Sequence, residues 1–394
     1  MIETKVIATL SLAGYTPTVK PKTIGQPGFL ASTLLAASLA LPAIAQSNKP
    51  NVIEFDVPGA GTVSSPACAN ALGCGTVAFA NNDLGVIVGF YTDANVVAHG
   101  FLRAPDGNII SFDVPGAGLG VGLDQGTFAY CINDLGAIAG AFEDSSSVYH
   151  GFLRAPDGSF TTFDAPGAGT GANQGTWAWS LNLHGTTAGT YIDGNNVTHG
   201  FVRSRDNEIA QFDPPDSVLT YPCEETCLGP DGTVIGFYNV ANGTSYGFAR
   251  TPDGKIAKIN APGAATGYGT IAASISQDGT IGGYFGDANL EAHGFVRAPD
   301  GRFTEFEAPG ATGIGTAAFS INVSGAVTGE FFDANNVMHG FFRSADGAFA
   351  TFNAPDAGTG AFQGTRPSTN NAEGTVAGWY VDENSLNHGF IWRP

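Results

Sequence analysis

The sequence predicts an all-β chain folded as a seven-bladed β-propeller, and three observations lead to this prediction. A Gly-Phe pair followed closely by arginine recurs seven times, with 46 to 51 residues between successive copies. Each copy contains four short strand-like runs separated by turn residues. The chain has 56 glycines and 22 prolines, and only 13% of its residues are charged. A period of this length with four strands per unit is typical of a propeller blade.

The strand pattern is clearest in the second copy, where Thr127 to Ile132, Ala137 to Phe142, Val148 to Arg154 and Ser159 to Asp164 are the four expected strands. The last copy stops after its third strand. A run matching a fourth strand, 52–58, stands alone before the first copy. Joining these two segments would complete the seventh blade and close the ring, which removes open sheet edges. An open β-solenoid is the alternative, and it does not explain the divided blade.

The beginning of the chain has the pattern of an export signal. Lys20 and Lys22 precede an apolar run from Leu30 to Leu41, and Ala43-Ile44-Ala45 resembles a cleavage site. We therefore expect 1–45 to be a signal peptide and 46–394 to be a single propeller domain, secreted or periplasmic. The apolar run is short for a membrane span. An uncleaved anchor is the alternative, and no membrane insertion is expected after cleavage.

The formal net charge of −19 limits the possible partners. An acidic surface repels phosphate backbones and anionic lipids, so we expect no nucleic acid partner. Export makes the five cysteines candidates for disulfides. The short spacings predict bridges between Cys68 and Cys74 and between Cys223 and Cys227, and Cys131 is expected to be a buried free thiol.

A histidine precedes six of the seven Gly-Phe pairs, and carboxylates or amides recur around it. An aspartate stands six residues before each histidine, and an acid or amide stands fourteen residues after it, with Asp56 serving the last copy through the closure. The copy around Tyr246 lacks the whole set, which suggests that the three side chains touch. The sets are Asp93, His99 and Asp113; Asp144, His150 and Asp164; Asp193, His199 and Asp213; Asp287, His293 and Glu307; Asp333, His339 and Asn353; and Asp382, His388 and Asp56.

A histidine between carboxylates can serve catalysis or bind a metal, but six copies around one ring favour a structural network. Thr76, Thr127 and Thr176 are expected to supply hydroxyl groups to it. The seven arginines that follow the Gly-Phe pairs are interpreted as ties between blades. We expect no resident metal or cofactor. Calcium is an alternative at Asp93-Ala94-Asn95 and 333–336, although Asx turns explain these segments equally well.

The network resembles the Asp, His and Ser/Thr arrangement that joins blades in Trp-Asp repeat propellers. The repeat also resembles a family of extracellular bacterial repeats named for a His-Ala-Phe motif, with glycine here in place of alanine, over about 340 residues. This resemblance implies export and a repeated β fold. It supplies no catalytic residues.

Positions that differ between the copies are where function can reside on a repeated scaffold. We place Trp177, Glu224 and Arg366 at equivalent first-strand positions near the axis, with Tyr221 and Glu225 beside Glu224. Aromatic rings with a carboxylate and an arginine suit a sugar or uronic acid. The alternatives are packing between blades for the aromatic residues, a solvated loop for the glutamates, and an ion pair for Arg366.

Two functions from different classes follow from this patch. The first is an exported binding or scaffold module for an extracellular polysaccharide or a protein partner. The second is a polysaccharide lyase or glycoside hydrolase on a propeller scaffold. A hydrolase needs two carboxylates that face one another, and Glu224 and Glu225 are adjacent in the chain, so they make a poor pair. We assign no catalytic residue and favour the binding function.

Overall fold

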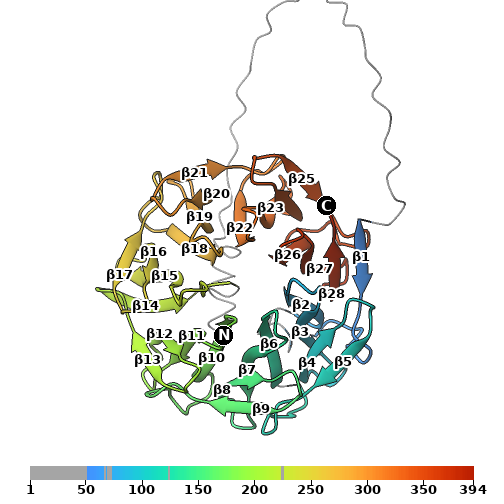
Figure 1. Ribbon diagram of the computed structural model, residues 1–394. Coiled ribbons are helices and arrows are strands. Elements are labelled where there is room, and N and C mark those ends of the chain that lie inside the picture. Colours follow the sequence, from blue (N-terminus) through green and yellow to red (C-terminus); the bar gives the residue numbers. More distant parts are fainter. Residues whose placement is uncertain (1–50, 66–67, 69–72, 123–124, 223–225) are drawn as a thin grey trace, which may run out of the picture.

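A computed structural model describes residues 51–65, 68, 73–122, 125–222 and 226–394. This part of the chain forms strands β1 to β28 and contains no α-helix. Figure 1 shows the strands gathered into sheets around a central axis, which is the architecture of a β-propeller. Within the same residues, no helix is long and apolar enough to cross a membrane.

Antiparallel pairing joins the strands in groups of four, from an inner strand near the axis to an outer one (Figure 1). The inner strands are β2 (Gly75–Asn81), β6 (Gly126–Ile132), β10 (Gly175–Leu181), β14 (Ser217–Pro222), β18 (Gly269–Ile275), β22 (Thr316–Ile321) and β26 (Gly364–Asn370). The second strands are β3 (Ile87–Thr92), β7 (Ile138–Glu143), β11 (Thr187–Ile192), β15 (Val234–Val240), β19 (Ile281–Gly286), β23 (Val327–Phe332) and β27 (Val376–Val381).

The third strands carry the Gly-Phe motif. They are β4 (Ala98–Arg103), β8 (Tyr149–Arg154), β12 (Thr198–Arg203), β16 (Ser245–Arg250), β20 (Ala292–Arg297), β24 (Met338–Arg343) and β28 (Asn387–Trp392). The outer strands are β5 (Ile109–Phe112), β9 (Phe160–Phe163), β13 (Ile209–Phe212), β17 (Ile256–Ile259), β21 (Phe303–Phe306), β25 (Phe349–Phe352) and β1 (Val52–Phe55).

Strand β1 lies beside the last strand of the chain. It pairs antiparallel with β28, with Val52 opposite Trp392 and Phe55 opposite Gly389. The first residue of β2, Gly75, in turn forms a parallel bridge to Asn387 of β28. The two ends of the described chain are therefore joined through backbone pairing in one sheet.

The Gly-Phe motif is explained by packing at the centre of each sheet. Its phenylalanine is fully buried in every copy, because it fills the space between neighbouring sheets. In six copies its glycine lies under an aromatic ring of the outer strand, and in the fourth copy Gly247 lies under Ile259. A Cβ atom at Gly100 would approach the ring of Phe112 to 2.6 Å, and one at Gly389 would approach that of Phe55 equally closely. A larger residue at the glycine position would push the outer strand away.

In five copies the arginine that follows the motif stacks on a phenylalanine of the preceding outer strand, whereas Arg297 lies over Phe303 of its own outer strand. The guanidinium of Arg103 lies 4.9 Å from the ring centroid of Phe55, and that of Arg154 lies 4.9 Å from that of Phe112. These are cation–π contacts between sheets, as the predicted ties require. In the last copy Trp392 takes this strand position and stacks on Phe352 at 4.6 Å, so Arg393 is one residue beyond it.

Glycine also sets the spacing between neighbouring sheets. Gly126 begins β6 and forms a parallel bridge to Ala98 of β4. Its φ is +139°, and a Cβ atom there would lie 1.9 Å from the carbonyl oxygen of Ala98. The same bridge recurs at Gly75, Gly175, Gly269, Gly315 and Gly364. Only glycine allows the two backbones to come this close.

Asparagine side chains add a second set of links between the sheets. Asn82 donates its Nδ2 hydrogen to the carbonyl oxygen of Asn133, and Asn133 does the same to Asn182. Asn371 donates to the carbonyl oxygen of Asn82 and so connects the last sheet to the first. Each of these amides also accepts backbone N–H groups of its own turn, for example that of Val86 on Asn82. The repeated Gly-Phe and histidine motifs did not indicate these asparagines.

The fourth copy departs from the common pattern in its inner strand. Thr220 lies opposite Tyr238, as Thr76 lies opposite Tyr91. Leu228 is bridged to Val234 at the other end. Thr220 and Leu228 are eight positions apart, whereas Thr76 and the corresponding Asn81 are five apart, so this copy has three additional residues. The residue before Thr220 is Leu219 instead of glycine, and no bridge from β14 to β12 is found among the described strands.

The disulfide between Cys68 and Cys74 is confirmed. It packs with Leu386 of the last copy, in the segment between β1 and β2. Cys131 is a buried free thiol, as predicted. Cys227 is also a buried free thiol, which differs from the predicted bridge to Cys223; Cys223 lies outside the described residues.

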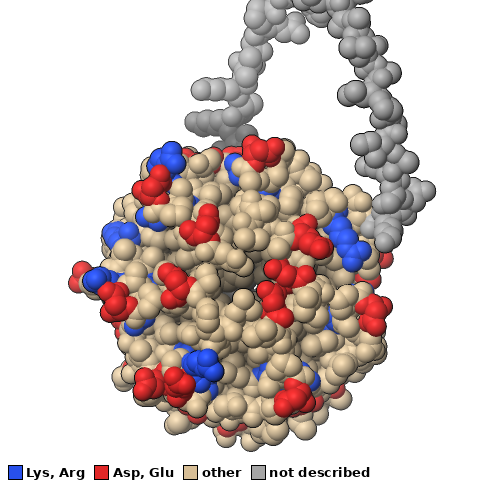
Figure 2. Space-filling model, in the orientation of Figure 1, with Lys and Arg blue, Asp and Glu red and all other residues tan. Residues whose placement is uncertain are grey.

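Figure 2 shows acidic side chains distributed around the ring and a hollow at its centre.

We expect Gly126→Ala to destabilise the fold by about 3 kcal/mol or more, because a methyl group there meets a backbone carbonyl at a positive φ. Gly194→Ala is the matched control, since a Cβ atom at Gly194 has no neighbour within 4 Å. Its effect should stay within about 0.5 kcal/mol. Chemical denaturation measures both. Equal stability of the two variants would contradict the proposed role of the bridge.

Candidate functional site

The predicted contact between each histidine and the acid or amide fourteen residues later is present in all six copies. Histidine Nδ1 lies 2.9 Å from Asp113 Oδ1 at His99, and 2.7 Å from Asp213 Oδ2 at His199. His293 pairs with Glu307 in the same way. The remaining contacts are His150 with Asp164, His339 with Asn353, and His388 with Asp56. The pairing of β4 with β5, and its equivalents, bring these side chains together across two strands.

The aspartate six residues before each histidine faces the other ring nitrogen. His99 Nε2 lies 3.8 Å from Asp93 Oδ2, and the corresponding distances in the other five copies are 3.6 to 3.7 Å. The ring also stacks on an aromatic residue of the second strand, such as Tyr91 on His99 at 5.1 Å. Each histidine is therefore held on both edges and on one face.

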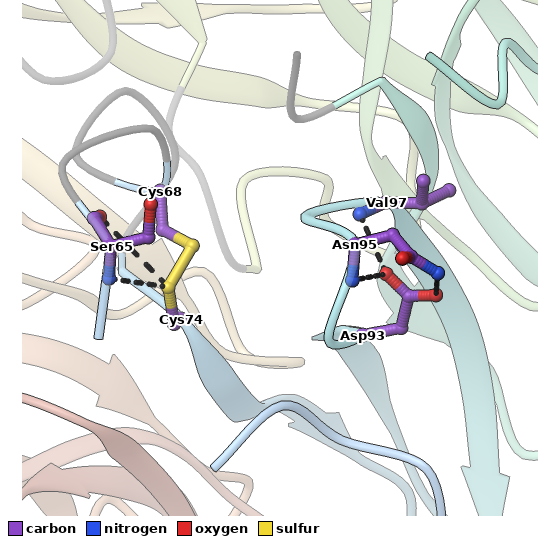
Figure 3. Close-up of a disulfide and its surroundings, with 6 residues drawn as sticks. All are labelled: Ser65, Cys68, Cys74, Asp93, Asn95 and Val97. Atoms are coloured by element: carbon purple, nitrogen blue, oxygen red, sulfur yellow. Dashed lines mark hydrogen bonds between the residues drawn. A yellow bond between two sulfur atoms is a disulfide. The ribbon is translucent and has the colours of Figure 1, made fainter. Parts of the chain in front are cut away.

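The aspartate itself is occupied by its own turn. Asp93 Oδ1 accepts the backbone N–H groups of Asn95 and Val97, and Oδ2 accepts the Asn95 side-chain amide (Figure 3). These Asx-turn bonds account for the Asp-x-Asn segments that suggested calcium. No group of three or more His, Cys, Asp or Glu residues suited to a metal ion occurs in the described part of the chain.

Threonine hydroxyls at the start of the inner strands complete the network. Thr76 Oγ1 accepts the backbone N–H of Val57, and Thr127 Oγ1 accepts that of Val114. Thr176 accepts from Ala165 in the same way. The residue that donates each backbone N–H directly follows, along the chain, the acid that contacts the histidine of the preceding sheet. The network therefore connects one sheet to the next.

Hydrogen bonds within the network shift the pKa values of two histidines and one aspartate. The hydrogen bond to Asp113 raises the pKa of His99, and the hydrogen bond to Asp56 raises the pKa of His388, each against an opposing effect of burial. The backbone N–H of Val197 lowers the pKa of Asp193. The folded protein therefore favours the charged imidazole at His99 and His388 and the charged carboxylate at Asp193.

In the copy without a histidine, Tyr246 takes the histidine position and makes a different contact. Lys258 Nζ lies 3.1 Å from the ring centroid of Tyr246, and Tyr238 packs beside that ring at 5.7 Å. Lys258 is on β17, opposite Phe248 on β16. A cation–π contact between neighbouring strands thus replaces the histidine set in this sheet.

The predicted aromatic residues near the axis are buried in packing between sheets. Trp177 is 5% exposed and Tyr221 is 3% exposed. Trp177 lies 4.5 Å from Tyr149, and Tyr221 lies 5.4 Å from Phe237. The cluster continues through Trp179, Tyr130 and Phe79 on neighbouring inner strands to Trp379 on β27. These rings stabilise the interfaces near the axis and do not form an open platform.

The predicted register of the fourth copy was wrong. Tyr221 lies opposite Phe237, as Trp177 lies opposite Thr190, so Tyr221 and not Glu224 occupies the position equivalent to Trp177. The three additional residues of this copy shift Glu224 away from the position that its distance from the Gly-Phe motif predicts. Glu224 and Glu225 lie outside the described residues.

Arg366 is the remaining residue of the predicted patch, and its partner is a residue that the sequence did not indicate. Its guanidinium lies 5.0 Å from the ring centroid of Trp379 and 5.3 Å from that of Phe319. Arg366 Nε is 3.7 Å from Glu330 Oε2. The side chain of Glu330 is 8% exposed, and burial raises its pKa despite the neighbouring guanidinium. Arg366 is thus a cation held between two rings, with its side chain 15% exposed.

No family model matches the sequence, and no curated protein does. The chain is similar to the solved structure of puromycin hydrolase, with 12% identity over 83% of this chain and 55% of that one, and a TM-score of 0.50. It is also similar to the BP39L lectin from Burkholderia pseudomallei, with 10% identity over 80% of this chain and 98% of that one, and a TM-score of 0.47. The chain spans about half the length of the puromycin hydrolase chain. At these identities the similarity concerns the fold alone.

We expect His388→Gln to remove a pH-dependent part of the stability. Because the folded pKa of His388 is raised above its ordinary value of 6.5, its contribution is complete below that value and is lost as the pH rises through the folded pKa. The variant should be less stable by about 1 kcal/mol at pH 6, and the difference should shrink by pH 8. Unfolding curves at several pH values measure this.

His184→Gln is the control, because His184 is an exposed turn residue outside the six sets. Its unfolding free energy should follow that of the parent protein at every pH. A pH-independent difference between His388→Gln and the parent would contradict the role assigned to the charged imidazole.

Proposed function

We propose that this chain is an exported propeller that acts as a binding or scaffold module, with an acidic carbohydrate as its ligand over the axis. In this proposal, 1–45 is a cleaved signal peptide. The Cys68–Cys74 disulfide supports the location, because such bonds persist in oxidising compartments outside the cytosol. The resemblance of the repeats to extracellular His-Ala-Phe repeats supports it as well.

The proposal includes one closed domain of seven blades over 46–394. The pairing of β1 with β28 and the bridge from Gly75 to Asn387 support closure, because they join both ends of the described chain. The hydrogen bond from Asn371 to Asn82 adds a side-chain link at the same junction. A closed ring is a rigid support for a ligand site, since every sheet then packs between two neighbours.

One observation carries the choice of site. Arg366 is the only charged residue on the inner strands as the structure describes them. Its Nε faces Glu330, and no hydrogen bond from its terminal nitrogens to a described residue is found. A guanidinium has five donors in a planar fork that matches a carboxylate. These donors, held by Trp379 and Phe319, would bind the carboxylate of a uronic acid unit.

A second observation favours binding over catalysis. The other inner-strand side chains near the axis pack against one another, and the histidine–carboxylate sets are engaged in their own network. Glu330 has a raised pKa and could serve as a general acid, so a hydrolase or lyase is the alternative function. A hydrolase would need a second carboxylate facing Glu330 across the substrate.

The test is a panel of neutral and uronate-containing polysaccharides, read for binding and for release of reducing sugar. We expect uronate polymers to bind and no product to form. Arg366→Ala should weaken binding at least about tenfold, which is a loss of about 1.4 kcal/mol. Because Arg366→Ala leaves Glu330 without its partner, the double variant Arg366→Met with Glu330→Gln is measured too. It removes both charges with little change in volume.

Arg302→Ala is the matched control, because Arg302 is an exposed arginine paired with Asp300 on a hairpin. Its binding should equal that of the parent. Unchanged binding in both Arg366 variants would exclude this site. Release of product that is lost in Glu330→Gln would establish the enzyme alternative instead.

A further inference from the structure

A second, separate cavity lies between the last sheet and the first. It has a volume of about 270 Å³. It lies where β2 and β4 end, whereas the histidine sets lie where β4 begins. It is therefore at the opposite end of the strands from those sets. Ile87 and Ile391 form apolar parts of its wall, and both are buried.

Two arginines line this cavity. Arg103 stacks on Phe55 of β1, which fixes its guanidinium. Arg393 comes from the end of β28, where Trp392 has taken the stacking position. The charge of Arg393 adds to the effect of burial in lowering the pKa of Arg103, so the two guanidinium groups are near enough to repel each other. The position of Arg393 holds a small residue in the other copies: Ala104, Ala155, Ser204, Thr251, Ala298 and Ser344.

Two carboxylates line the same cavity. Asp83 Oδ1 accepts the backbone N–H of Ala372 at 2.7 Å, which orients this carboxylate at the junction of the two sheets. Glu373 follows in the same turn and is exposed. Among the described residues, neither carboxylate forms an ion pair with Arg103, with Arg393 or with any other cationic side chain. The cavity therefore contains two positive and two negative groups that do not neutralise one another directly.

We propose that this cavity binds a small zwitterion, namely a free α-amino acid with an aliphatic side chain. Arg103 and Arg393 would bind its carboxylate, and Asp83 and Glu373 would bind its ammonium group. A simple anion would meet the two carboxylates, and a simple cation would meet the two guanidinium groups. The volume of about 270 Å³ leaves room for a small organic molecule. This space suits one amino acid, and the isoleucines suit an aliphatic side chain.

Calorimetric titration of the whole protein with L-valine tests the proposal. We expect L-valine to bind. Its methyl ester lacks the carboxylate and N-acetyl-L-valine lacks the ammonium group, so both should bind at least tenfold more weakly. Arg393→Ala and Glu373→Gln should each weaken L-valine binding at least tenfold with an unchanged melting temperature, because both side chains are exposed. Arg302→Ala is the control and should bind as the parent does.

Several results would overturn the proposal. Absence of L-valine binding would refute the site. Equal affinity for N-acetyl-L-valine or D-glucuronate would mean that the cavity binds simple anions, and equal affinity for the methyl ester would mean that it binds simple cations. Unchanged binding in both Arg393→Ala and Glu373→Gln would place the ligand elsewhere. None of these outcomes depends on Arg366, so the two proposed sites are tested independently.

Discussion

The contact between the motif glycine and the aromatic ring of the outer strand is the constraint on which the other features depend. The ring of Phe112 occupies the space that a side chain at Gly100 would fill. This contact fixes the distance and register of the third and outer strands. The register then places His99 opposite Asp113 and lets Arg154 stack on Phe112 from the next sheet. One small residue thus sets the position of an ion-pairing group, a core ring and a link between sheets.

The same constraint explains why histidines flanked by carboxylates recur without implying chemistry. Both ring nitrogens of His99 face acids, and one of these acids, Asp93, is held by backbone N–H groups of its turn. Because both ring nitrogens contact carboxylates and the set recurs around the ring, we interpret it as a structural network. Protonation of His99 stabilises the fold in this interpretation, because the hydrogen bond to Asp113 raises the pKa of the imidazole.

Positions that differ between the repeats are where function can reside on a repeated scaffold, and the structure shows two such differences. Arg366 stands where other inner strands have apolar residues, and Glu330 of the neighbouring sheet is its partner. Trp392 stands where other third strands have arginine, and this displaces Arg393 into the cavity at the junction of the first and last sheets. In both cases an arginine lies outside the repeated set of stacked arginines, and each is the centre of one of the two proposed sites.

The sequence by itself determined the β fold, the pairing of His99 with Asp113 and its equivalents, and the disulfide between neighbouring cysteines. These depend on short spacings that repeat, so comparison of the copies reveals them. The tertiary structure decided that Trp177 is buried, that Tyr221 replaces Glu224 in the register, and that Arg366 faces Glu330. Contacts between sheets join residues whose separation follows no local period, and an insertion within a strand shifts the alignment. Such contacts depend on how the sheets pack around the axis, which periodicity along the chain does not encode.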